Sequence, residues 1–412
     1  MIVMSPETLR QRSDYTHKFN TRTGRHGWLR LTPAYSLKIV EELMGEVGQE
    51  LRVFDPFCGT ATTGLSAAYH GHYAATTEIN PFLIWFGKAK IAHYRDSVLS
   101  ATRHASIAAL DLVDRAVVSP VPLPPIHNIE RWWGARELEF LQLLRAAINV
   151  VASSSEQEKD LLLVAFCRTL IRLSNASFNH QSMSFKSSDG DAAILHDAEA
   201  FFAEDVSFVL EGAAHNPEGE CSIVKCDARN LSSALNQKFD LVITSPPYAN
   251  RMSYIRELRP YMYWLDYLVN GRDAGELDWE AIGGTWGIAT SRLTDWKPES
   301  SDYQSDRLDA VLQAVAHSDN ANGAIMANYI AKYFVDMWKH FSGLSSVLAD
   351  GARVHYIVGN STFYGVLLPV ETFYADMLTA LGFENIKIRP VRKRNSKKEL
   401  VEYDVSAVWK GK

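Results

Sequence analysis

Residues 240–248 read Asp-Leu-Val-Ile-Thr-Ser-Pro-Pro-Tyr, an apolar strand followed by a serine, two prolines and a tyrosine. The hydroxyl of Ser245 and the carbonyl of Pro246 can accept hydrogen bonds, and consecutive prolines keep the turn rigid because their φ is fixed. Such acceptors suit an amino group on an aromatic ring, since they draw its delocalised lone pair back onto nitrogen. The ring of Tyr248 offers a flat surface beside them. The alternative is a strand end where the prolines stop the sheet and the tyrosine packs in the core.

A second motif, residues 51–63, reads Leu-Arg-Val-Phe-Asp-Pro-Phe-Cys-Gly-Thr-Ala-Thr-Thr. It predicts a short strand, a tight turn at Gly59 and a helix over residues 64–69. This is the arrangement in which a doubly wound α/β fold binds a cofactor at the carboxyl end of its first strand. By itself, a turn of this kind fits any strand-to-helix corner of an α/β protein.

Together the two motifs resemble those of the amino-methylating DNA methyltransferases, which use S-adenosylmethionine, and the resemblance covers residues 15–94 and 220–412. The usual cofactor motif of that family is Asp-Pro-Phe-x-Gly-Ser-Gly-Thr-Thr. Here Thr60 and Ala61 replace the serine and the second glycine, and we expect the methyl group of Ala61 to weaken cofactor affinity. The resemblance implies that a flipped-out base stacks on Tyr248 while its amino group is held for direct methyl transfer. The implied catalytic residues are Ser245, Pro246, Pro247 and Tyr248.

Acidic residues complete the cofactor site that the resemblance implies. Glu78 ends a predicted strand over residues 73–77 and would bind the ribose hydroxyls, while Asp227 follows a predicted strand over residues 222–225 and would accept from the adenine amino group. Taken singly, an acid at such a position is more often a solvated loop residue than a ligand. Asp55 would face the methionine end of the cofactor. The predicted cofactor-binding residues are Asp55, Pro56, Phe57, Gly59, Thr60, Thr62, Thr63, Glu78, Ile79, Asn80, Asp227 and Ala228.

The composition of the 412 residues, 47% hydrophobic and 22% charged, indicates a globular protein with one large domain and an elaboration, or with two domains. No apolar stretch approaches ~20 residues and residues 1–12 lack an apolar signal core, so we expect no membrane segment and a cytoplasmic location. The four cysteines lack C-x-x-C spacing, which supports neither a disulfide framework nor a metal site. No Pro-Cys dipeptide occurs, which argues against methylation of cytosine carbon 5 through a thiolate adduct.

A basic segment, residues 387–398, holds seven lysines and arginines in twelve positions between two β-like runs, residues 383–391 and 400–409. These runs predict a hairpin with its turn at residues 395–396. The net charge of −6 opposes a polyanionic partner overall, but phosphate neutralisation is local. We therefore expect phosphate contacts here, with a solvated hairpin tip as the alternative. The predicted contact residues are Arg392, Lys393 and Arg394.

Residues 95–218 interrupt the predicted sheet and have helical apolar spacing over residues 135–151, 156–174 and 197–212. We interpret this segment as an inserted helical domain and a candidate for target recognition. Its polar side chains are of types that read base edges and hold phosphates, although a polar loop would look the same. The candidates in the insert are Arg172, Asn179, His180 and Lys186, and those after the catalytic motif are Arg251 and Arg256.

Two further segments have less specific patterns. Residues 25–35 resemble the family's N-terminal motif, which closes over the cofactor, and their His26, Trp28 and Tyr35 either contact it or pack. Residues 270–324 read as a variable connection and a possible second recognition element.

The whole pattern predicts a doubly wound, Rossmann-like methyltransferase sheet of seven strands with an antiparallel C-terminal hairpin, formed by residues 1–94 and 219–412. Serine at the first motif position is more usual in cytosine-N4 enzymes of the family, whereas adenine-N6 enzymes more often carry aspartate. The resemblance implies double-stranded DNA as substrate and a cognate restriction or defence nuclease as partner. An adenine-N6 DNA methyltransferase, an RNA methyltransferase and a catalytically inactive DNA-binding homologue remain as alternatives.

Overall fold

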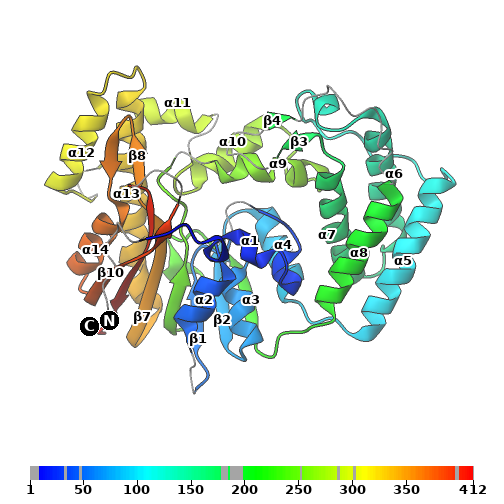
Figure 1. The fold of residues 1–412 in the computed structure, drawn as a ribbon, viewed down its shortest axis with the longest axis horizontal. Coiled ribbons are helices and arrows are strands. Elements are labelled where there is room, and N and C mark those ends of the chain that lie inside the picture. Colours follow the sequence, from blue (N-terminus) through cyan, green and yellow to red (C-terminus); the bar gives the residue numbers. More distant parts are fainter. Residues whose placement is uncertain are drawn as a thin grey trace.

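The structure is a computed structural model that describes residues 9–31, 35–45, 49–177, 184–185, 198–250, 253–284, 288–299, 303–394 and 399–411. Its centre is a seven-stranded sheet in the order β10-β11-β7-β6-β1-β2-β5 (Figure 1). The strands are β1 (Arg52–Asp55), β2 (Tyr73–Glu78), β5 (Cys221–Lys225), β6 (Phe239–Thr244), β7 (Leu348–Gly359), β10 (Glu384–Lys393) and β11 (Val401–Val408).

Neighbouring strands from β5 to β7 are parallel, whereas β11 is antiparallel to both β7 and β10. The predicted fold class, including the antiparallel C-terminal hairpin, is confirmed. Strand order reverses between β1 and β6, so the carboxyl ends of these two strands flank the switch-point crevice where doubly wound sheets bind ligands.

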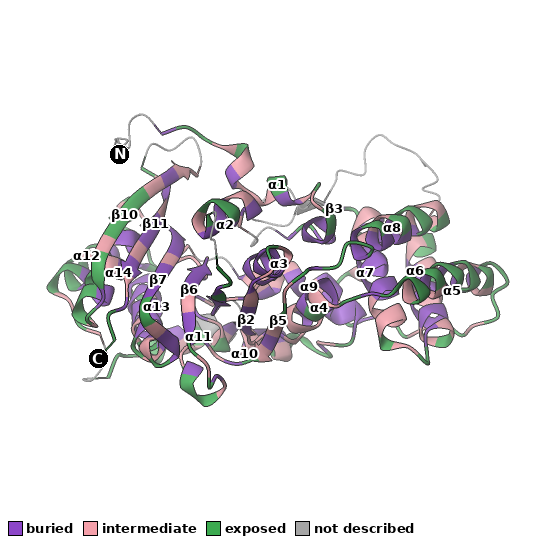
Figure 2. Ribbon diagram, turned by 90° about the horizontal axis from the view of Figure 1, so that it is seen from below, coloured by how far each residue is buried: buried purple, intermediate pink, exposed green. Residues whose placement is uncertain are grey.

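Helices cover both faces of the sheet, as parallel strands require. On one face, α2 (Leu37–Met44) and α3 (Thr62–Tyr69) form a core with Leu241 and Ile243. On the other, α13 (Gly323–Leu344) and α14 (Val370–Ala380) pack with Val242. Figure 2 shows the buried middle of the sheet and the largely exposed edge strand β10.

The segment between β2 and β5 is mainly helical and extends away from the sheet (Figure 1). Its helices are α5 (Asp96–Asp114), α6 (Ala135–Val151), α7 (Glu156–Arg172) and α8 (Ala198–Ala213). The last three match the predicted helical runs to within two residues at each end. Their apolar core is continuous with α4 (Pro81–Ile91) and α9 (Tyr254–Trp264). The insert thus packs onto the helices that flank the pocket described below; its status as a separate domain stays a prediction.

The shorter elements complete the described chain. None of the helices in the described ranges is long and apolar enough to cross a membrane. The remaining elements are α1 (His17–Asn20), α10 (Gly271–Glu280), α11 (Ile288–Asp295), α12 (Asp306–Ala316), β3 (Ala176–Ser177), β4 (Ser184–Phe185), β8 (Ser361–Phe363), β9 (Val366–Leu368), and 3-10 turns at Ser13–Tyr15, Gly24–Gly27, Ile129–Arg131, Leu231–Ser233 and Ser345–Val347.

The N-terminal segment is anchored by Arg25, whose buried guanidinium donates hydrogen bonds to backbone carbonyls of α4, at Lys90, and of α8, at Gly212. His26 and Trp28 are buried beside it, and neither lines the pocket. Of the three residues predicted to contact the cofactor or to pack, these two therefore pack. Tyr35 lines the pocket.

Candidate active site

A pocket of about 590 Å³ lies at the carboxyl ends of β1, β2, β5 and β6. Both predicted motifs contribute to its wall, so the candidate cofactor residues and the candidate catalytic residues share one cavity. The predicted residues that line it are Pro56, Phe57, Gly59, Thr60, Thr62, Glu78, Ile79, Asn80, Asp227, Ala228, Ser245, Pro246, Pro247, Tyr248, Arg392 and Arg394.

Glu78 ends β2 and is held by three backbone N–H groups. Its Oε1 accepts from Ile79 N and Asn80 N, both at 2.9 Å, and its Oε2 accepts from Gly59 N at 3.0 Å. Burial raises the pKa of Glu78 to about 7, although these hydrogen bonds favour the carboxylate. The acid therefore ties the cofactor loop to the end of β2, and about one of its four acceptor sites stays free for a donor in the pocket.

Cofactor affinity should depend on pH through Glu78. Below a pKa of about 7 the carboxyl group is protonated and accepts hydroxyl donors poorly, so affinity should fall as pH decreases. We expect S-adenosylmethionine to bind about tenfold more weakly at about pH 6 than at about pH 8, as measured by calorimetry. A Glu78→Gln variant should show a flat profile over this range, and an equally steep profile in that variant would contradict the assignment.

Asp55 lies beneath the pocket rather than on its wall, and it is fully buried. Its Oδ1 accepts from Thr244 Oγ1 at 2.5 Å and from Phe57 N at 3.0 Å, which joins the end of β6 to the cofactor loop. Its Oδ2 has no hydrogen-bond partner among the described residues. Burial raises the pKa of Asp55 to about 6. Thr63, the other predicted cofactor residue outside the wall, donates to the carbonyl of Ile243 on β6 at 3.0 Å.

The cofactor loop carries two left-handed residues, Gly59 (φ +50°) and Ala61 (φ 57°). The side chain of Ala61 packs in a small apolar cluster with Cys58 and Ile223 and does not line the pocket. Our expectation that its methyl group obstructs the cofactor therefore has no support in the geometry. The cost of alanine at this position is backbone strain, which a non-glycine residue incurs in the left-handed region.

Lys90 on α4 supports the same loop from below. Its buried Nζ donates to the carbonyl of Thr60 at 2.5 Å. Burial lowers the pKa of Lys90 to about 7, but a neutral amine still donates, so the contact survives deprotonation. The contact between Lys90 and Thr60 could not be predicted from the sequence pattern of α4.

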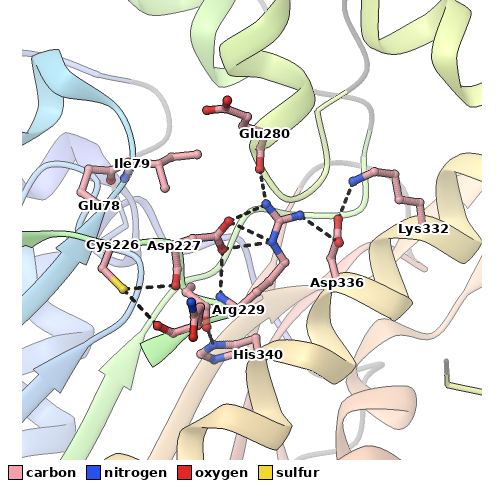
Figure 3. Close-up of polar contacts among 11 residues, drawn as sticks. Glu78, Ile79, Cys226, Asp227, Arg229, Glu280, Lys332, Asp336 and His340 are labelled. Carbon is pink, nitrogen blue, oxygen red and sulfur yellow. Dashed lines mark hydrogen bonds and ion pairs between the residues drawn. The ribbon is translucent and has the colours of Figure 1, made fainter. Parts of the chain in front are cut away.

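Asp227 is engaged by Arg229, a residue that the motif analysis missed (Figure 3). Arg229 Nη2 lies 2.6 Å from Asp227 Oδ2, and its Nε donates to both carboxylate oxygens. Burial opposes ionisation of Asp227, but the hydrogen bonds from Arg229 outweigh it and lower the pKa. Arg229 also donates to Asp336 and to the carbonyl of Glu280, where α10 ends. Through these contacts Arg229 joins Asp227, the candidate adenine-binding acid, to the connection over residues 270–324. Glu280, which belongs to this connection, lines the pocket.

The Ser-Pro-Pro-Tyr motif follows β6 as an irregular segment held by tyrosines from three helices. Tyr254 Oη accepts from Tyr248 N at 3.0 Å, and Tyr333 Oη donates to the carbonyl of Pro247 at 2.8 Å. Tyr333 in turn contacts Tyr374 Oη at 2.6 Å. The carbonyl of Pro246 accepts no hydrogen bond from the described part of the chain, so the predicted acceptor remains available.

The predicted nucleic-acid contacts outside the basic hairpin fall into three groups. Arg172 pairs with Glu204 at 2.7 Å and its guanidinium carbon lies 3.9 Å from the centroid of the Phe201 ring, both within the helical insert. Arg256 lies on α9 and does not line the pocket. Arg251, Asn179, His180 and Lys186, together with the turn at residues 395–396, lie outside the described residues.

The basic hairpin points two of its three predicted contacts inward. Arg392 and Arg394 line the pocket, whereas Lys393 does not. The N-terminal segment adds basic residues that the motifs did not predict, because their place on the wall depends on how residues 11–18 pack and not on any local spacing. These additional lining residues are Arg12, His17 and Lys18.

No protein-family model matches the chain. The chain is 24% identical over 482 aligned residues to the type II methyltransferase M.BsoBI of Geobacillus stearothermophilus, and the match covers 99% of this chain and 88% of that protein. It is 21% identical over 358 aligned residues to the type II methyltransferase M.MvaI of Kocuria varians, with 82% of this chain and 76% of that protein covered. The chain is thus distantly similar, over nearly its whole length, to type II methyltransferases.

Proposed function

We propose that this chain is a type II DNA methyltransferase that transfers a methyl group from S-adenosylmethionine directly to the N4 amino group of a flipped-out cytosine. The observation that carries the proposal is the single pocket lined by the cofactor motif, by Glu78 and Asp227, and by Ser245–Tyr248. The distant similarity to two type II methyltransferases supports it and suggests a restriction-modification system with a cognate nuclease.

The pocket fits S-adenosylmethionine by the chemistry of its donors and acceptors. Glu78 keeps about one free acceptor site for a ribose hydroxyl, and Asp227, kept ionised by Arg229, is an acceptor for the adenine amino group. Asp55 is fully buried beneath the cofactor loop and does not line the pocket, so its predicted contact with the methionine end of the cofactor has no support in the geometry. When bound, the cofactor supplies an electrophilic methyl group.

The protein side of the reaction requires two acceptors and an aromatic surface. Ser245 Oγ and the carbonyl of Pro246 accept from the two N–H groups of the target amine, which concentrates its lone pair on nitrogen. Tyr248 stacks on the extruded base and holds the amine in line with the methyl group. We favour cytosine over adenine because serine occupies the first position of the motif.

Label transfer tests the reaction class. The purified chain is incubated with methyl-labelled S-adenosylmethionine and with double-stranded plasmid DNA from a host without DNA methyltransferases. Parallel reactions contain RNA of matched length. We expect label in the DNA. Label confined to RNA would replace the proposal with an RNA methyltransferase, and no label with measurable cofactor binding would favour a binding-only homologue.

A further inference from the structure

Tyr248 and three residues around its ring form a polar cluster, which we call the tyrosine clamp: Tyr248, Glu402, Arg392 and Arg394. Tyr248 Oη donates to Glu402 Oε1 at 2.8 Å. Arg392 donates to both oxygens of Glu402, from Nε at 2.8 Å and from Nη2 at 3.2 Å. The guanidinium carbon of Arg394 lies over the Tyr248 ring, 5.1 Å from its centroid. All four residues line the candidate active-site pocket.

The clamp is built into the C-terminal hairpin and not into the catalytic motif. Glu402 lies on β11 and is 4% exposed, while Arg392 lies on the neighbouring strand β10. Glu402 and Arg392 are cross-strand partners in the sheet, so their pairing geometry is fixed by the backbone register. A bidentate arginine then leaves the carboxylate little freedom to rotate.

Arg394 is held as firmly on the other side of the ring. Its Nη1 donates to the carbonyl of Asn360 at 2.7 Å, and its side chain packs directly against Gly359, where a Cβ atom would lie 2.7 Å from Nη1. Its backbone N–H donates to the carbonyl of Leu400. The ring of Tyr248 is therefore fixed at its hydroxyl end by one arginine-bound carboxylate and along its face by a second, anchored arginine.

Burial, and then the nearby carboxylate of Glu402, raise the pKa of Tyr248 well above its usual value. The phenol is thus protonated throughout the neutral range and donates to Glu402. A hydrogen bond to a charged acceptor is among the stronger orienting contacts available to a side chain.

We propose that Glu402 is a positioning residue that, through the Tyr248 hydroxyl, fixes the ring in the orientation that receives the target base. This inference rests on the proposed function. It also reassigns the basic hairpin, because Arg392 and Arg394 act inside the pocket instead of serving only as phosphate contacts. If the Tyr248 ring rotated freely, the base stacked on it would not hold its amine in one position. Small misplacements of reacting groups slow transfer strongly.

The same strand offers a matched control. Asp404 lies two residues from Glu402 on β11, is 2% exposed and pairs with Arg389 of β10, 3.3 Å away. It does not line the pocket. Asp404→Asn and Glu402→Gln therefore remove one buried carboxylate each from the same hairpin, and only the second variant disturbs the clamp.

The test compares Glu402→Gln, Tyr248→Phe, the double variant and Asp404→Asn. For each protein, methyl transfer to plasmid DNA gives kcat and the KM for DNA, and calorimetry gives the affinity for S-adenosylmethionine. We expect kcat to fall by about tenfold or more in either clamp variant, with unchanged cofactor affinity. The double variant should be no slower than the worse single variant, because both substitutions act on the same Tyr248–Glu402 contact.

The outcomes separate this inference from the proposed function. A wild-type protein that transfers no methyl group overturns the proposed function and the inference with it. An active wild type whose Glu402→Gln variant behaves like Asp404→Asn overturns the inference alone. Multiplicative losses in the double variant, or a parallel loss of cofactor affinity, would also overturn it, since either result indicates a general structural effect.

Discussion

Replacing Ser245 with alanine will slow methyl transfer by roughly a hundredfold to a thousandfold and leave cofactor affinity unchanged. The hydroxyl is one of two acceptors proposed for the target amine, and removing one preorganised polar group from an active site typically costs this much. Ser245 lines the pocket just after β6, whereas Glu78 and the backbone groups that hold it lie at the ends of β1 and β2. The substitution at Ser245 therefore leaves the cofactor contacts of Glu78 in place. The measurement is single-turnover label transfer to DNA together with calorimetry of S-adenosylmethionine.

Ser207 provides the control for this prediction. Its hydroxyl is exposed on α8 and donates to the carbonyl of Ala203, so Ser207→Ala removes the same atom far from the pocket. We expect its rate to match the wild type within about twofold, as for ordinary surface substitutions. A Ser245→Ala variant that keeps the wild-type rate would remove the hydroxyl from the mechanism.

Replacing Glu78 with glutamine will weaken S-adenosylmethionine binding by about a hundredfold, or about 2.7 kcal/mol. The carboxylate accepts from Gly59 N through one oxygen and from Ile79 N and Asn80 N through the other. An amide retains one oxygen, and its NH₂ group must then face an N–H donor or the ribose hydroxyls without accepting from them. The substitution removes a charged acceptor from both the backbone N–H groups and the ribose, and the loss of hydrogen bonds to a charged group justifies the magnitude.

Glu371 is a matched control for Glu78. It is a buried carboxyl group on α14 whose pKa burial raises to about 7, yet it does not line the pocket. Calorimetry should show wild-type cofactor affinity for Glu371→Gln and the same pH dependence as the wild type. If both glutamine variants lost affinity equally, the effect would be a general response to removing a buried acid.

The sequence was sufficient to predict the fold because both motifs are local. Residues 51–63 and 240–248 each join an apolar strand to turn-forming residues, and such patterns depend little on the rest of the chain. Glu78 ends β2 and Asp227 follows β5, so both could be placed at strand ends from the sequence, and both line the pocket; their cofactor roles stay predictions. Their meeting in one pocket then follows from parallel strand order.

The residues that support the site were not predictable in the same way. Three supporting residues contact partners that lie far from them in the sequence, so these contacts arise only from tertiary packing. They are Glu402, Arg229 and Lys90. The basic hairpin illustrates the limit most clearly. Its charge density predicted phosphate contacts, but composition carries no information on which way Arg392 and Arg394 point.

The most direct test of the proposed reaction is nucleoside mass spectrometry of DNA from cells that express this chain, beside cells that express the Ser245→Ala variant. Our account predicts N4-methylcytosine in the first sample and its absence from the second. N6-methyladenine that vanishes in the variant would retain the mechanism and correct the base. An identical nucleoside profile in the two samples would contradict the account.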